Sequence, residues 1–139
     1  MATDNPFPLP TTLGSDLARV LDYWRGLKRG GNDMPFWDDV KLAALPDLAD
    51  TLVLVDVFAA PERFRLNTVG KKFGDPSLHG KFIDETEFAG GLAFLRAQAS
   101  ATVEARAPTY YRGGGFARLL LPMWGDGRIG MLLGGLEVG

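Results

Sequence analysis

Apolar residues recur at helical spacing near the start of the chain. They stand three or four positions apart at Leu13, Leu17, Val20, Leu21, Trp24 and Leu27. Ser15 precedes the first turn as an N-cap, and the helix should stop before Gly30-Gly31. Because the opposite face is charged, the pattern predicts an amphipathic helix whose apolar stripe is covered by the protein's own core or by a second subunit.

Five segments carry the pattern of β-strands, with apolar and β-branched residues either continuous or alternating with polar ones. They are residues 51–58, 63–69, 108–112, 116–123 and 128–138. Residues 59–62 suit a tight turn between the first two strands, and Gly125-Asp126-Gly127 suits one between the last two. The pattern therefore predicts two hairpins and one further strand.

The segment between the second and third strands has helical character. Gly70, Pro76 and Gly80 allow only short turns, but from Phe88 onward a helical period returns and ends before Pro108. The order of elements predicts an α+β fold, a single five-stranded antiparallel sheet with helices on its face and an N-terminal flanking helix. With 139 residues this is one domain, residues 13–139, preceded by a proline-containing flexible leader at residues 1–12.

Composition excludes several classes of function. Fifteen Lys and Arg residues against 17 Asp and Glu give no electrostatic reason to expect a nucleic acid or an anionic membrane as partner. The sequence has no cysteine, which excludes disulfides, thiolate nucleophiles and zinc–thiolate sites. The longest apolar stretches are about half the ~20 residues of a membrane helix, so a cytoplasmic protein is expected.

Several short motifs occur in a distinctive order. They are Tyr23-Trp24-Arg25, Met34-Pro35, residues 52–57, residues 63–66, Val69-Gly70, residues 79–83, residues 120–123 and Asp126-Gly127. Over residues 15–137 the chain resembles a family of small, stand-alone bacterial PAS-type domains. The His79-Gly80-Lys81-Phe82-Ile83 segment is similar to the Gly-basic-x-hydrophobic signature of the PAS fold. The resemblance implies a sensory or regulatory domain rather than an enzyme, and no particular cofactor comes with it.

We therefore expect a signalling module that binds a small apolar ligand or a protein partner. Two alternatives stay open: a small α+β enzyme acting on an apolar substrate, and a dimerisation or interaction module without a ligand. Gly130, Leu132 and Gly134 share one parity, so side chains are missing from one face of the last strand. Either a helix packs closely there or a small cavity lies between the sheet and the helices. The expected lining residues are Phe64, Leu66, Phe82, Phe94, Gly130 and Leu132.

Two charged residues are the polar candidates for this site. Asp56 interrupts an apolar strand, where it should either reach solvent at the margin of the sheet or pair with an arginine such as Arg63, Arg65 or Arg118. Arg118 is itself the second candidate. His79, the only histidine, lies in a glycine-rich loop and is interpreted as structural.

No metal site is expected. Asp38 and Asp39, and likewise Asp84, Glu85 and Glu87, precede helical patterns, where carboxylates complement the helix dipole without a metal.

The first helix also suggests a homodimer. Its stripe is wide for an exposed helix, and the residues expected at an isologous interface are Leu17, Val20, Leu21 and Trp24. The alternative is that this stripe packs wholly on its own sheet.

Overall fold

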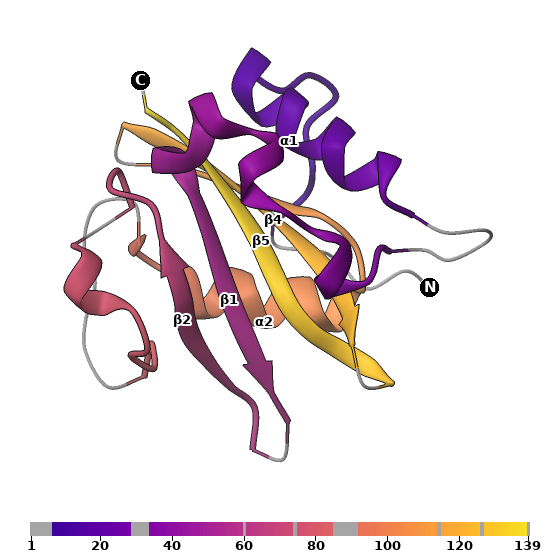
Figure 1. Cartoon of the computed structure of the whole chain (residues 1–139), viewed down its shortest axis with the longest axis vertical. Coiled ribbons are helices and arrows are strands. Elements are labelled where there is room, and N and C mark those ends of the chain that lie inside the picture. The colour runs from indigo at the N-terminus through magenta and orange to yellow at the C-terminus, as the bar shows by residue number, and fades with distance from the viewer. Residues whose placement is uncertain are drawn as a thin grey trace.

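A five-stranded antiparallel sheet runs through the described part of the protein (Figure 1). In this computed structural model the described residues are 7–28, 34–59, 61–73, 75–84, 92–113, 115–125 and 127–138. The strands are β1 Leu52–Phe58, β2 Arg63–Val69, β3 Thr109–Gly113, β4 Phe116–Gly125 and β5 Arg128–Val138, in the order β2-β1-β5-β4-β3. The predicted α+β class with one such sheet is confirmed.

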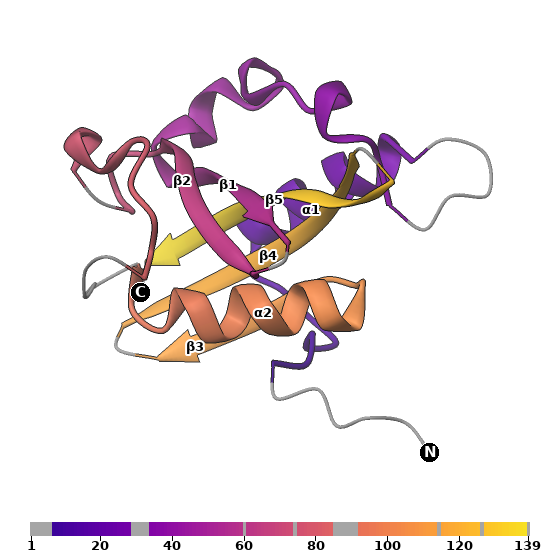
Figure 2. The ribbon, with the colours of Figure 1, turned by 90° about the horizontal axis from the view of Figure 1, so that it is seen from below.

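Helices cover both faces of the sheet, as the second view shows (Figure 2). The helix α1 (Ser15–Gly26) lies on β4 and β5, which we call the α1 face. On the same face follow the short 3-10 helices η1 (Trp37–Asp39), η2 (Leu42–Ala44) and η3 (Pro46–Thr51). The helix α2 (Leu95–Ala105) lies on the opposite side, the α2 face, and η4 (Pro76–Leu78) lies beside β2.

The apolar stripe of α1 packs on its own sheet. Leu17, Val20, Leu21 and Trp24 are each no more than 5% exposed within the single chain. Trp24 also donates its indole N–H to the Pro122 carbonyl, at 2.9 Å. The approach is close, because a Cβ on Gly135 would lie 3.2 Å from Leu17 Cδ2 and the leucine would have to shift slightly to admit it. These four side chains are therefore core, and their assignment to a dimer interface is corrected.

The glycines of β5 do not border one common cavity. Met131 is opposite Met123 and Ile129 is opposite Trp124, so Gly130 is the extra residue of a β-bulge. The bulge breaks the parity that the sequence predicted for Gly130 and Leu132. At Gly134, the space for a side chain is already filled by Val53 and Leu120.

The chain before α1 contacts the outermost strand. Tyr110 donates its backbone N–H to the Phe7 carbonyl at 3.1 Å, and the Phe7 ring lies 6.0 Å from that of Tyr111. Within the described residues, no helix combines the length and apolar character needed to cross a membrane. Some predicted features lie outside the described residues: leader positions 1–6, the helix boundaries at Gly30-Gly31 and Phe88, the turn residue Asp126, and Glu85 and Glu87.

Candidate functional site

A pocket of about 320 Å³ lies between the C-terminal end of α2 and the ends of β1, β4 and β5. We call it the α2 pocket. Its walls are largely apolar, formed by Val57, Phe58, Ala59, Val103, Trp124 and Ile129. Val103 comes from α2, whereas Trp124 and Ile129 face each other across β4 and β5. The bulge at Gly130 places Ile129 opposite Trp124, so a local irregularity of the sheet shapes this wall.

Three charged side chains also line the α2 pocket, and each is positioned by its own contacts. The Arg106 guanidinium lies over the Trp124 ring, 5.3 Å from its centroid. Arg128 donates from Nη1 to the carbonyls of Val57 at 2.7 Å and Ile129 at 3.1 Å. Glu62 accepts a hydrogen bond from the Ser100 hydroxyl at 2.8 Å. The pocket thus combines apolar walls with oriented polar groups, the usual composition of a small-molecule site.

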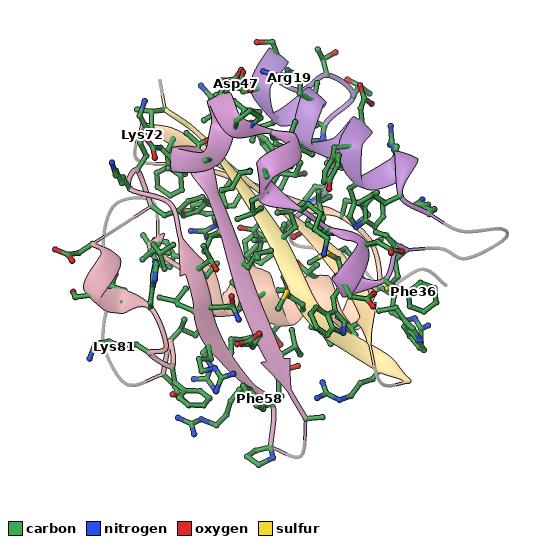
Figure 3. All side chains as sticks on the ribbon, viewed as in Figure 1. Arg19, Phe36, Asp47, Phe58, Lys72 and Lys81 are labelled. Atoms are coloured by element: carbon green, nitrogen blue, oxygen red, sulfur yellow. The ribbon has the colours of Figure 1, made fainter. Side chains whose placement is uncertain are left out.

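A second, more polar pocket of about 270 Å³ lies on the α1 face, beside Trp37. Its centre is an ion pair between Asp56 and Arg65, at 2.9 Å, to which Asn67 adds a hydrogen bond of 3.3 Å. Asp56 therefore pairs with an arginine as the sequence predicted, and the partner is Arg65. Phe58 stands at the lower end of this face in Figure 3, with the Arg65 guanidinium 5.0 Å from its ring centroid.

Arg118 lies instead in a polar cluster buried under α2. Its side chain is fully buried and its Nε donates to Gln98 Oε1 at 2.7 Å. Gln98 Nε2 donates to the Thr109 hydroxyl at 3.1 Å, and the hydroxyls of Thr102 and Thr109 are 2.6 Å apart. The ring of Tyr111 lies 5.3 Å from the Arg118 guanidinium. Burial lowers the pKa of Arg118 to about 10, because desolvation disfavours the charged form.

The lining residues expected from the sequence do not form one cavity. Phe64, Leu66 and Leu132 are completely packed in the core. Phe82 pairs with Arg65 at the edge of β2, and its ring lies under the Arg63 guanidinium at 3.8 Å. Phe94 is 69% exposed. Gly130 lines the second pocket, on the α1 face. The prediction of a common cavity is therefore wrong, because some of its expected residues are packed in the core while others lie at the edge of β2, in the second pocket or exposed before α2.

His79 has a structural position at the edge of the sheet. Its Nε2 lies 3.0 Å from the backbone nitrogen of Val69, from which it can accept a hydrogen bond. Neither pocket described above includes it among its lining residues. Across the described ranges, no three His, Asp or Glu side chains are grouped to hold a metal ion.

The sequence pattern did not predict the buried polar cluster that contains Gln98, Thr102 and Thr109. Gln98 stands three positions after Leu95, and Thr102 four after Gln98. Leu95, Gln98 and Thr102 therefore share the buried face of α2. That spacing was a usable signal, since a polar residue inside an apolar stripe must find a partner. Nothing in the spacing identifies the partner, which comes from β3 and β4.

No protein-family model, no curated protein and no solved structure matches this chain. Its function is therefore inferred from the residues and geometry of the site.

Proposed function

We propose that the chain is a PAS-type sensory or regulatory domain that binds a small ligand in the α2 pocket. The observation that carries this proposal is the pocket itself, about 320 Å³ in volume with largely apolar walls. That volume lies within the range of small-molecule sites, which begins at ~300 Å³. The antiparallel sheet with a helical crossover between β2 and β3 agrees with the resemblance in its coarse architecture.

The charged groups of the α2 pocket favour binding over catalysis. Two of the three are guanidiniums, which stay protonated near neutral pH and cannot exchange protons with a substrate. The third, Glu62, is held by Ser100. An enzyme of acid–base type would need a second titratable group beside Glu62, and the histidine lies elsewhere.

Filling the pocket tests the proposal. Val103 is half-buried on α2 and lines the pocket, so a Val103→Trp side chain would occupy the ligand's space. Native mass spectrometry of the purified full chain should show a bound mass in the wild type. We expect Val103→Trp to lose that mass while its thermal unfolding stays cooperative.

The matched control is Glu104→Trp, which adds the same bulk at the next, exposed position of α2. It should retain the bound mass. A chain that is bare over several preparations would contradict the proposal and favour an interaction module. Equal retention of the mass in both variants would contradict the assignment to this pocket.

A further inference from the structure

The charges around the α2 pocket are unequal. Arg106 and Arg128 carry two positive charges and Glu62 one negative charge, so the lining carries a net charge of about +1 at neutral pH. The two arginines come from different elements, one just after α2 and the other at the start of β5. A ligand inside the pocket would therefore meet an excess of positive charge beside apolar walls.

Each guanidinium, although its residue is exposed, already has a contact that orients it. Arg128 uses Nη1 for two backbone carbonyls, and among the described residues no acceptor is bonded to its Nε or Nη2. Arg106 rests over the Trp124 ring and makes no ion pair with any described carboxylate. Donors that are positioned in advance lose little conformational entropy when they bind an anion.

We infer that the α2 pocket binds an amphipathic monocarboxylate, an inference that rests on the proposed function. The carboxylate would accept hydrogen bonds from Arg106 and Arg128, whose planar donors match its geometry. The apolar body would lie against Val57, Val103 and Ile129. A single negative charge balances the lining, whereas the second charge of a phosphate monoester would remain unbalanced near Glu62.

Phenylacetate and phenylacetamide test the inference, because they share a shape and differ in charge. Isothermal titration into the full chain should show phenylacetate binding about tenfold or more tightly than the amide, as charge-assisted hydrogen bonds imply. The variant carrying Arg106→Gln and Arg128→Gln should lose this preference. Arg112→Gln is the matched control, since it removes an exposed arginine of β3 that does not line the pocket.

The outcomes separate the ligand class from the proposed function. Equal affinity for acid and amide, or no binding of phenylacetate, would overturn the monocarboxylate inference. A preference for phenylacetate that survives loss of both arginines would also overturn it, as would tighter binding of phenyl phosphate. If a neutral co-purified mass is lost in Val103→Trp, the inference fails but the proposed function stands.

Discussion

The two helices that cover the sheet differ in what they bury. Helix α1 places four large apolar side chains on β4 and β5, and the only side-chain hydrogen bond of this stripe in the described structure comes from Trp24. Helix α2 buries Leu95 and Ala99, but between and beside them it also buries Gln98 and Thr102 completely. One face of the sheet is thus closed by apolar packing, and the other includes a polar cluster.

This difference accounts for where a binding site can form. Apolar packing fixes its partners through shape, whereas a buried hydrogen-bond network also fixes the orientation of donors and acceptors. The contacts of Gln98 with Thr109 and Arg118 hold α2 at one end of the strands. Directly after Thr102, Val103 and the C-terminal end of the helix border the α2 pocket. Helix α2 is therefore fixed by its buried hydrogen bonds, and its C-terminal end borders the pocket.

The largest expected loss of stability comes from a charge placed in the apolar contact between α1 and the sheet. Leu17→Asp puts a carboxylate where the native side chain is 1% exposed and packs against Gly135 of β5. An unpaired buried charge costs several kcal/mol, so we expect a loss of ~4 kcal/mol or more and unfolding of much of the population. Circular dichroism and urea unfolding measure this directly.

Arg25→Asp is the control for that substitution, because Arg25 lies on the exposed side of the same helix. It reverses a charge in the last turn of α1, so it should lower the free energy of unfolding by ~1 kcal/mol, well below the loss expected for Leu17→Asp. A Leu17→Asp protein with native stability and a monomeric mass by light scattering would contradict the core assignment. It would restore the interpretation of α1 as a subunit interface.

The same contrast explains what the sequence could predict. The stripe of α1 and the strands of the sheet follow from local periodicity, because burial on one face repeats every three to four or every two residues. The polar cluster depends on pairs such as Gln98 with Arg118, twenty positions apart, and no local rule selects that partner. The bulge at Gly130 is similarly invisible in the pattern, although it reverses the face of Ile129 and so helps form the pocket.

The prediction of a cavity was wrong for a related reason, since it also depended on contacts between distant parts of the chain. Phe64 belongs to β2, whereas Phe82 and Phe94 belong to the connection between β2 and α2, and the path of that connection is not encoded in a local period. The sequence pattern does not predict the contact of Arg106 with Trp124, because this contact joins the end of α2 to the end of β4. Helix ends and hairpin ends meet through the tertiary fold, and single-sequence patterns do not contain that information.

A smaller loss of stability is expected when the polar cluster under α2 is disrupted. Gln98→Leu keeps the volume nearly unchanged but removes the oxygen that accepts from Arg118 and the nitrogen that donates to Thr109. Because desolvation already lowers the pKa of Arg118, losing an acceptor leaves its charged form less compensated. We expect the free energy of unfolding to fall by ~2–4 kcal/mol in urea titrations.

The control is Arg96→Leu, which places the same residue on the exposed side of α2. It should be close to neutral. Adding Arg118→Met to Gln98→Leu should cost less than the sum of the two single changes, since the pair acts as a unit. Strict additivity, or a Gln98→Leu protein as stable as Arg96→Leu, would show that the cluster is not what orders α2.

The smallest expected effect concerns the ion pair that joins α1 to η3. Arg19 Nη1 lies 2.6 Å from Asp47 Oδ2, and both side chains are exposed at the top of the view in Figure 3. The hydrogen bond from Arg19 holds the pKa of Asp47 below its ordinary value of 3.8. A depressed carboxyl pKa stabilises the fold above the unfolded-state pKa, and that contribution disappears as pH falls through the lower, folded-state value.

Asp47→Asn should therefore lower the urea midpoint slightly at neutral pH, and the difference from wild type should vanish once the pH falls below the lowered, folded-state pKa of Asp47. Added salt should also shrink it, because the pair is exposed and screened. In an Arg19→Gln background the same substitution should have no further effect at any pH. If it still destabilises there, Asp47 acts through the start of η3 rather than through α1, and the apolar stripe alone would hold α1 on the sheet.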